Sequence, residues 1–436
     1  MGPDLKSAVI PSGVGRPATA AIELDRWIRP GDTLLWGQSS AEPLTLVSAY
    51  TAQRHRFART RAFLGIGLSG LLEPAHADAI DFIGYGGRGT NRALADAGVL
   101  DVLPCHYSDL PGLMRSGVLR VDVLLLQVPP ADAQGRHSLG LAHEYLLAAL
   151  DTARVVIAEV NDQMPWTVGS RLLHASEIDV HVDASYAPLQ ALSASPGERE
   201  SSIAAHVASL IEDGATLQCG LGAIPEAVLG ALQGRRDLGV HSGTVGDAVM
   251  RLMESGAVTN ARKGRDTGVT IAGVLIGSSR LHRFAHCNEA LQMRGTEYTH
   301  HPEVLASLER FVAINSAVEV DLTGQVNSEV AAGSYVGAVG GAVDFLRGAQ
   351  RSRGGVPVVA LPSTAGANTR IVATLTGPIS TPRCDAGVFV TEYGIADLRG
   401  LPLAARMRRM LDIAHPSHRG RLEQDAFVDR RKPAQR

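Results

Sequence analysis

The sequence is poor in cysteine, in aromatic residues and in long apolar runs. Aromatic side chains make up 4% of the 436 residues, and there are four cysteines. The cysteines stand far apart and form no C-x-x-C pair: Cys105, Cys219, Cys287 and Cys384. Such spacing predicts neither a disulfide framework nor a thiolate zinc site, and it favours a cytoplasmic location.

Charge of one sign and membrane-spanning runs are also missing. The chain carries 41 Lys and Arg against 44 Asp and Glu, a net charge of −3, which offers no basic stripe for the phosphates of a polynucleotide. Apolar stretches such as 121–128 fall well short of the roughly 20 residues that a membrane span needs, and no charged-then-apolar signal segment opens the sequence. We therefore expect neither nucleic acid nor a membrane as a partner.

What the chain does contain is apolar material for two cores. Its length is roughly two to three times that of a typical single domain, 45% of its residues are hydrophobic, and 47 are glycines. Apolar runs recur, each followed by a glycine-bearing turn and a segment with helical spacing, a pattern typical of parallel α/β folds. The predicted strands are 32–37, 62–68, 79–85, 121–128 and 154–160, then 215–220, 269–277, 311–320, 357–363 and 386–392.

The same order of elements restarts after residue 190, which predicts two related domains. Residues 184–200 are rich in Ala, Ser and Pro and have weak periodicity, so they serve best as the linker. We place the domains at 1–187 and 188–436. A short self-match supports duplication, because residues 31–37 and 214–220 share the pattern G-x-T-L-x-x-G.

Two glycine-rich turns are strong local signals. Residues 220–225 (GLGAIP) follow a predicted strand, and Pro225 suits the first position of a helix, where its missing N–H is no loss. Free amides at a helix start attract phosphates or carboxylates. A dinucleotide-binding site is only weakly indicated, because Pro225 stands where that fingerprint has its third glycine. The alternative is a plain tight turn that binds no ligand. Farther on, Gly340 and Gly341 remove two successive side chains, so that a ligand or another backbone can approach closely.

Histidines and one cysteine are the other chemical signals. Four histidines fall within twenty residues: His282, His286, His300 and His301. They form no H-E-x-x-H pattern and have no carboxylate partner at ligand spacing, so we expect no metal. Residues 241–247 (HSGTVGD) precede a predicted helix, beyond the carboxyl end of a strand, where open α/β sheets place their sites. A Ser-His-Asp hydrolase is not indicated, because the sequence has no G-x-S-x-G elbow. Cys219, between a predicted strand and a glycine turn, is either a buried inert thiol or a nucleophile.

These motifs resemble the acetyl-CoA hydrolase/transferase family, the family I CoA-transferases that include 4-hydroxybutyrate CoA-transferase. The resemblance runs over nearly the whole chain. In the first half it covers HYSDLP at 106–111, VDVLLLQVP at 121–129 and EVNDQMP at 159–165. In the second half it covers GLGAIP at 220–225, AINSAVEVDLTGQV at 313–326, VGGAVDF at 339–345, ALPST at 360–364, VTEYG at 390–394 and IAHP at 413–416.

The resemblance implies a fold of two related open α/β domains that face each other across a cleft, the CoA-transferase-like, NagB/RpiA-type arrangement. It also implies CoA-thioester chemistry: in the family a glutamate attacks an acyl-CoA, CoA forms a glutamyl thioester, and a second carboxylate collects the CoA. Coenzyme A or acyl-CoA is then the substrate, and the partners are a small-molecule acyl-CoA and an acyl or CoA acceptor. Family members are commonly homo-oligomers, and we expect one here.

Position 243 departs from the family pattern. The family's glutamate lies in a segment resembling H-T-E-M after a strand L-G-I, whereas this chain reads L-G-V-H-S-G-T at 238–244. Gly243 stands in the nucleophile's place, so a glutamyl-CoA intermediate cannot form there. We expect a water or an external nucleophile to occupy the vacated volume and to attack the thioester carbonyl directly.

The segment near residue 300 departs as well. Relatives carry an asparagine just before a proline, thought to donate to the thioester oxyanion, and here the residues are His300, His301 and Pro302. A neutral imidazole can also donate, and because the ordinary pKa of histidine is near ~6.5, either histidine is a candidate general base. The family's other oxyanion donor, a glycine amide, corresponds to Gly341, and a glutamine that several relatives carry after the two glycines is Ala342 here.

Three functions remain open at this point. We expect contacts with CoA or the substrate at Gly220, Gly222, Ala223, Ile224, Pro225, His241, Ser242, Gly340, Gly341 and Ala342. The leading hypothesis is acyl transfer from a CoA thioester to water or an external nucleophile without a glutamyl-CoA intermediate. A genuine acyl-CoA:carboxylate CoA-transferase, of the acetate or 4-hydroxybutyrate type, would need another carboxylate, for which Glu392 and Glu289 are candidates. The third hypothesis is an acyl-CoA-binding homologue without catalysis.

Overall fold

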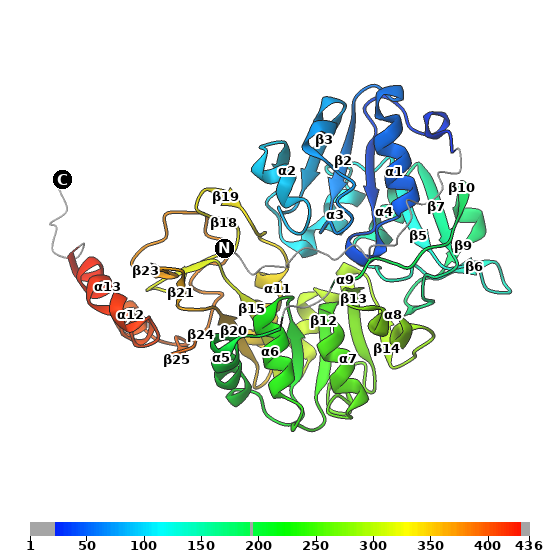
Figure 1. The fold of residues 1–436 in the computed structure, drawn as a ribbon. Helices are drawn as coiled ribbons and strands as arrows, with labels where there is room; N and C mark the ends of the chain where they lie inside the picture. The colour runs from blue at the N-terminus through cyan, green and yellow to red at the C-terminus, as the bar shows by residue number, and fades with distance from the viewer. Residues whose placement is uncertain (1–21, 192–194, 429–436) are drawn as a thin grey trace.

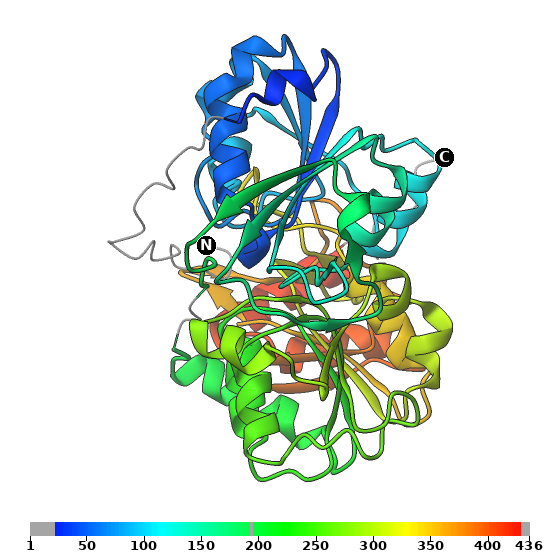
Figure 2. The same ribbon diagram turned by 90° about the vertical axis from the view of Figure 1, so that its right-hand side faces the viewer.

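The computed structural model describes residues 22–191 and 195–428, and each half of the chain builds one large, mainly parallel sheet (Figure 1). The first half is blue to cyan in this view, and the second half runs from green to red. Figure 2 shows the same two bodies from the side, stacked one above the other, with helices packed against each sheet. The prediction of two related α/β domains is confirmed.

The first sheet has seven parallel strands in the order β10-β7-β5-β1-β2-β3-β4. Its strands are β1 (Thr33–Trp36), β2 (Thr60–Leu64), β3 (Ile80–Gly84), β4 (Leu100–Val102), β5 (Val123–Val128), β7 (Val155–Asn161) and β10 (Val180–Ala184). Every residue of β5 is buried, which explains why this segment forms a continuous apolar run in the sequence.

The second sheet has nine strands in the order β25-β24-β20-β15-β11-β12-β13-β14-β8. Its strands are β8 (Val168–Gly169), β11 (Thr216–Cys219), β12 (Gly239–Val245), β13 (Thr270–Leu275), β14 (Leu291–Met293), β15 (Phe311–Ser316), β20 (Val356–Ala360), β24 (Val388–Thr391) and β25 (Gly394–Asp397). β25 is antiparallel to β24, and β8 comes from the first half of the chain.

The two sheets repeat one topology. Strands β7-β5-β1-β2-β3-β4 of the first sheet correspond in order to β20-β15-β11-β12-β13-β14 of the second. β1 and β11, which carry the shared G-x-T-L-x-x-G pattern, are the equivalent inner strands. In each sheet the chain leaves this strand toward one edge and later returns to its other side. A topological switch point therefore lies between β1 and β5 and another between β11 and β15, where ligands of open α/β sheets bind.

Helices connect the strands and cover the sheets. The longer ones are α1 (Leu44–Gln53), α3 (Leu110–Arg115), α4 (Leu146–Thr152), α5 (Glu198–Ser209), α6 (Ala223–Ala231), α7 (Asp247–Glu254), α8 (Ser279–Ala285), α10 (Pro302–Ser307), α11 (Ala342–Arg351), α12 (Leu403–Asp412) and α13 (Pro416–Val428). α12 packs against β25 at one edge of the second sheet, and α13 packs against α12; both helices are red in Figure 1. In 22–191 and 195–428, no helix combines the length and apolarity needed to cross a membrane.

All ten predicted strands are present, with shifted ends, and the segment 311–320 divides into β15 and β16 (Glu319–Asp321). Strand β12 was not predicted, because its sequence GVHSGTV lacks both an apolar run and a strict alternation. Residues 241–245 therefore belong to an inner strand instead of a turn. Pro225 is the third residue of α6, which begins at Ala223, and not its first; the N–H groups of a first helical turn have no partner in any case.

The segment predicted as a linker is partly packed. Tyr186 and Leu189 are buried, and α5 already begins at Glu198, while 192–194 lie outside the described residues. The Tyr186 hydroxyl donates to the carboxylate of Glu159, which in turn accepts hydrogen bonds from the N–H of Thr45 at 2.8 Å. This part of the connection is thus fixed to the first domain.

The first half also adds backbone to the second sheet. β8 pairs in parallel with β14, and residues 141–144 run antiparallel beside β13. The N–H of His143 donates to the carbonyl of Gly273 at 3.0 Å, and the N–H of Leu275 donates to the carbonyl of Leu141 at 2.9 Å. Because these bonds are made between backbones, they fix how the two halves face each other.

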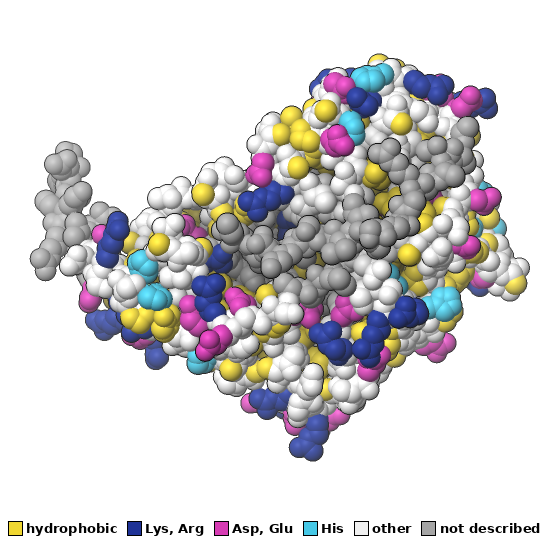
Figure 3. All heavy atoms as spheres, in the orientation of Figure 1, with side chains coloured by type: hydrophobic (Ala, Val, Ile, Leu, Met, Phe, Trp, Pro, Cys, Tyr) yellow, Lys and Arg dark blue, Asp and Glu magenta, His cyan; other side chains and the backbone are white. Residues whose placement is uncertain are grey.

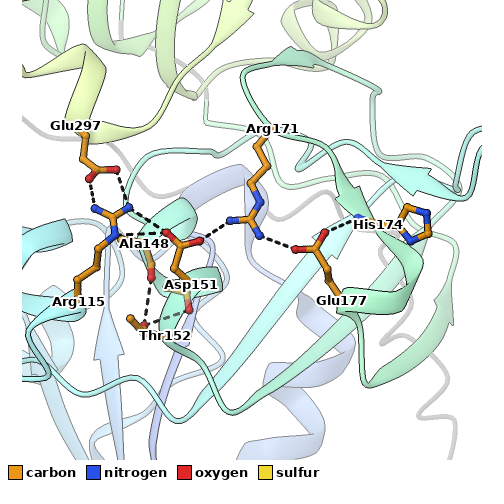
Figure 4. A network of polar contacts seen from close by, with 9 residues as sticks. Arg115, Ala148, Asp151, Thr152, Arg171, His174, Glu177 and Glu297 are labelled. Carbon is orange, nitrogen blue, oxygen red and sulfur yellow. Dashed lines mark hydrogen bonds and ion pairs between the residues drawn. The ribbon is translucent and has the colours of Figure 1, made fainter.

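Side-chain ion pairs span the same boundary (Figure 4). Arg115, at the end of α3, makes a two-pronged contact with Glu297 of α9 (Thr296–Thr299) and also contacts Asp151 at 3.1 Å. Arg171 joins Asp151 at 2.7 Å to Glu177. On the face in Figure 3, cationic and anionic side chains are interspersed in the same way, in keeping with the small net charge.

We expect Arg115→Ala to lower the free energy of unfolding by about 1 kcal/mol, because its pairs are partly exposed but belong to a network. Denaturant unfolding at low and high salt measures this, and added salt should shrink the difference. Arg56→Ala, which removes an exposed pair with Asp25 inside the first half, is the matched control. A larger loss for the control would contradict a specific bridge between the halves.

Candidate active site

A cavity of about 190 Å³ lies where the switch points of the two sheets meet. The first half contributes Gln38, just after β1. The second half contributes Cys219 and Gly220 from the end of β11, and Asn315 from the end of β15. The remaining lining residues include Tyr85, Arg88, Tyr107, Glu144, Gly243, Thr244, His300, Gly340, Gly341, Ala342 and Phe345. The duplicated topology thus builds one site from both halves.

The side-chain space beside Gly243 is filled by His300. A Cβ atom at position 243 would lie 2.9 Å from Cε1 of the His300 ring, and one at position 341 would lie 2.5 Å from its Nε2. The ring packs between Tyr107, with ring centroids 5.1 Å apart, and Phe345, at 4.5 Å. The expected open volume at Gly243 is therefore taken by an imidazole that packs against two aromatic rings.

The His300 imidazole is held neutral. It is 4% exposed, and burial lowers the pKa of His300 to about 3, because the charged form would lose its hydration. Its Nδ1 lies 2.8 Å from the hydroxyl of Thr299, while Nε2 points toward Gly341. At neutral pH this side chain can donate or accept a hydrogen bond, but its low pKa makes it a weak base.

His301, the alternative candidate, lies outside the cavity. It is exposed, and its Nδ1 accepts a hydrogen bond from the N–H of Glu303 at 3.2 Å. His301 therefore caps the N-terminus of α10. Of the two adjacent histidines, the structure brings His300 to the site.

The glycines predicted to hold an oxyanion do line the cavity. Gly341 is the residue before the first turn of α11, and Ala342 is the first residue of that helix. Gly340 has φ +57°, a left-handed conformation that favours glycine. The unpaired N–H groups and positive dipole end of α11 therefore face the cavity, an arrangement that stabilises negative charge on a bound oxygen atom.

A buried glutamate that was not predicted also lines the cavity. Glu144 is 3% exposed, and its carboxylate accepts hydrogen bonds from Nε2 of Gln38 at 2.7 and 2.9 Å and from the hydroxyl of Tyr107. Burial raises the pKa of Glu144 to about 7, although the two donors lower it in part. A carboxyl group with a pKa near neutrality thus lines the same cavity as His300.

Other predicted residues lie outside the cavity lining. Gly222 and residues 223–225 form the start of α6 behind Gly220, and Gly222 has φ +126°. In β12, His241 is buried with Nε2 3.1 Å from the carbonyl of Thr299, and the Ser242 hydroxyl donates to the carbonyl of Cys219 at 3.1 Å. These two side chains support the residues that do line the site.

The two carboxylates named for the transferase alternative also lie elsewhere. Glu392 accepts hydrogen bonds from the hydroxyl and N–H of Ser363, at 2.7 and 2.9 Å, and Glu289 is exposed. Neither lines the cavity. Burial raises the pKa of the Cys219 thiol to about 12, so this lining residue is protonated at neutral pH and poorly nucleophilic.

Comparison with known proteins decides the family. The N-terminal domain model of acetyl-CoA hydrolase/transferase matches residues 16–188, and the C-terminal domain model matches residues 277–426. The chain belongs to the acetyl-CoA hydrolase/transferase family. It is 41% identical to 4-hydroxybutyrate coenzyme A transferase of Clostridium kluyveri over 76% of this chain and 78% of the relative.

Two further members of the acetyl-CoA hydrolase/transferase family resemble nearly the whole chain. Succinyl-CoA:cyclohexane-1-carboxylate CoA transferase of Geobacter metallireducens is 34% identical over 93% of this chain and 94% of the relative. The crystal structure of RipA from Yersinia pestis superposes with a TM-score of 0.88 at 32% identity, over 93% of this chain and 96% of that one. The protein is thus an enzyme of the acyl-CoA transferase/hydrolase type, and CoA thioesters are the substrates of its family.

We expect Gly243→Ala to cost about 1–3 kcal/mol of stability, because the new methyl group meets a ring that cannot move freely. In a His300→Ala background the same change should cost much less, and a double-mutant cycle from denaturant unfolding measures the coupling. Gly220→Ala is the matched control, since a Cβ there has no atom within 4 Å. An equal cost of Gly243→Ala in both backgrounds would contradict the packing described.

Proposed function

We propose that this enzyme transfers the acyl group of a CoA thioester to water or to an external nucleophile without forming a glutamyl-CoA intermediate at position 243. The observation that carries the proposal is the pair Gly243 and His300. A glycine supplies no carboxylate, and the imidazole occupies the space where a carboxylate side chain would begin.

The rest of the cavity supports activation of a thioester. The amides of Gly341 and Ala342 at the start of α11 are suited to hold the carbonyl oxygen as negative charge develops on it. The neutral ring of His300, beside Gly341, can add a hydrogen bond to the same oxygen. Stabilising an oxyanion in this way retains part of the rate acceleration even where a covalent nucleophile is missing.

Transfer to a carboxylate through a covalent adduct is the second candidate. Among the described lining residues the sole carboxylate is Glu144, so this route would have to pass through that residue. The two candidates differ in one observable, because a glutamyl-CoA thioester can be reduced by borohydride and a direct transfer leaves nothing on the protein.

The test combines two measurements on the full chain. Incubation with a panel of acyl-CoA thioesters should release free CoA, detected by a thiol reagent, and borohydride treatment followed by peptide mass analysis should find no reduced glutamate. A reduced glutamate at any position would overturn the proposal in favour of a covalent transferase. Binding of acyl-CoA without CoA release, in the presence of water, amines, alcohols and carboxylates, would overturn it in favour of a non-catalytic homologue.

A paired substitution tests the role of position 243. We expect Gly243→Glu together with His300→Asn to create exchange of CoA between acyl-CoA and free carboxylates, and a trappable adduct, because the smaller amide gives the new carboxylate room. Gly243→Glu alone should gain much less, since the His300 ring stands against its Cβ. Exchange of labelled acetate into acetyl-CoA measures both, and equal gains would contradict the steric argument.

A further inference from the structure

We propose that Glu144 is the general base of the acyl-transfer reaction, which makes it a catalytic residue supplied by the first half of the chain. This inference rests on the proposed function. The carboxylate takes the proton of the attacking water or other nucleophile and later returns it to the departing sulfur of CoA. It is carried by the position of the Glu144 carboxyl in the cavity and by the groups that orient it.

Backbone from both halves holds Glu144 in place. Its carbonyl accepts a hydrogen bond from the N–H of Thr296 at 3.3 Å, and the preceding residue is bonded to Gly273 of β13. Glu144 has φ +26°, a conformation that costs energy for any residue other than glycine. Such strain persists where the surrounding structure fixes the residue firmly. Here the strained residue comes from the first half and lines a cavity that both halves build.

The side-chain partners of Glu144 leave it free to accept a proton. The amide oxygen of Gln38 accepts from the N–H of Ile66 and the hydroxyl of Tyr85, both at 2.7 Å, which fixes its Nε2 as the group that donates to Glu144. The Tyr107 hydroxyl donates to Oε2. Oε1 accepts a hydrogen bond from Gln38 at 2.9 Å, so a lone pair on this oxygen remains for a reactant in the cavity.

The pKa values of the two groups favour Glu144 over His300 as the general base. Burial raises the pKa of Glu144 to about 7 and lowers the pKa of His300 to about 3. A general base works best when its pKa lies near the operating pH. The titratable or charged groups beside Glu144 are Tyr85, Tyr107 and Tyr145, which interact with it, and Arg88 and His300, which line the same cavity. Burial also keeps the tyrosines protonated.

The reaction balances with water and a thioester alone. As the water oxygen bonds to the carbonyl carbon, one of its protons passes to Glu144 and the carbonyl π electrons move onto oxygen, facing the amides of α11. When the carbonyl re-forms, the C–S bond breaks and its electron pair leaves with sulfur. The sulfur takes the proton from Glu144, so CoA departs as a thiol and the carboxylate is regenerated. An amine or alcohol acceptor follows the same course.

The first domain contains a matched group that does not face the cavity. Gln127 donates to the Tyr186 hydroxyl at 2.8 Å, and that hydroxyl donates to Glu159, just as Gln38 and Tyr107 serve Glu144. Burial raises the pKa of Glu159 to about 8, but its carboxylate accepts hydrogen bonds from the N–H groups of Thr45 and Leu46 in the first turn of α1. Glu159→Gln therefore removes a buried carboxylate with similar hydrogen-bond partners, but it changes no residue that lines the cavity.

The experiment compares Glu144→Gln with Glu159→Gln in the full chain. We expect Glu144→Gln to lower the rate of CoA release by about 10²–10⁴-fold while binding of CoA, measured by calorimetry, is retained. Glu159→Gln should leave the rate within about threefold. A Glu144→Gln rate equal to that of the unchanged protein would overturn the role of Glu144 while the proposed function stands, whereas absence of CoA release from the unchanged protein would overturn the proposed function itself.

The pH dependence gives a second readout. Because the base must be ionised, we expect CoA release to rise with pH through an apparent pKa near 7, and Glu144→Gln should abolish that limb. Tyr107→Phe keeps the ring against His300 but removes a hydrogen bond that stabilises the carboxylate, so the limb should move up by about one pH unit. A limb that is unchanged in both variants would assign the titration to another group and overturn the proposal.

An infrared difference spectrum keeps the proposal testable without turnover. Subtracting the spectrum of Glu144→Gln from that of the unchanged protein isolates the Glu144 carboxyl stretch. This band should titrate near pH 7 and shift when a non-reactive ketone analogue of an acyl-CoA binds. A band that ignores the analogue would place the carboxyl away from the reacting atoms and contradict a catalytic role.

Discussion

The packing of the His300 imidazole determines which side chains fit in this active site. His300 stands where side chains at Gly243 and Gly341 would begin, and its ring packs against those of Tyr107 and Phe345. Protein interiors have little free volume, so a carboxylate at position 243 and this ring are alternatives. A glycine at position 243 and a histidine at position 300 are therefore sterically linked in this chain.

Burial away from water sets the protonation states of His300 and Glu144. The same burial that keeps the His300 ring neutral keeps the Glu144 carboxyl partly protonated near neutral pH, because both charged forms lose hydration in the cavity. One group is therefore suited to hydrogen bonding and the other to moving a proton. Glu159 is buried and has a raised pKa as well, but it does not line the cavity, so the two carboxyl groups differ in location and not in burial.

Much of the fold could be predicted from the sequence, since runs such as β5 carry an unbroken apolar signal and the G-x-T-L-x-x-G echo marks equivalent strands. Strand β12 could not, because Gly239, His241 and Gly243 give it no periodicity. Of the site, the lining positions Gly243, His300 and Gly341 were among those named. His301 could not be separated from His300, since the end of α9 decides which ring turns inward.

Glu144 was missed for a different reason. Its partners Gln38 and Tyr107 are far away in the sequence. The segment 141–144 is positioned by backbone hydrogen bonds to β13, and such bonds leave no pattern in the local sequence. One signal was available: Glu144 lies just before α4, close to the position that Gly341 has before α11, and both helices follow the equivalent strands β5 and β15. Treating the halves as repeats would have drawn attention to it.

The most direct test of the account is a crystal structure of the protein with a ketone analogue of an acyl-CoA. We expect the carbonyl oxygen within hydrogen-bond distance of the Gly341 amide, and a water or acceptor atom between the carbonyl carbon and Oε1 of Glu144. A carbonyl group bound outside this cavity, or one in direct contact with a carboxylate other than Glu144, would contradict it.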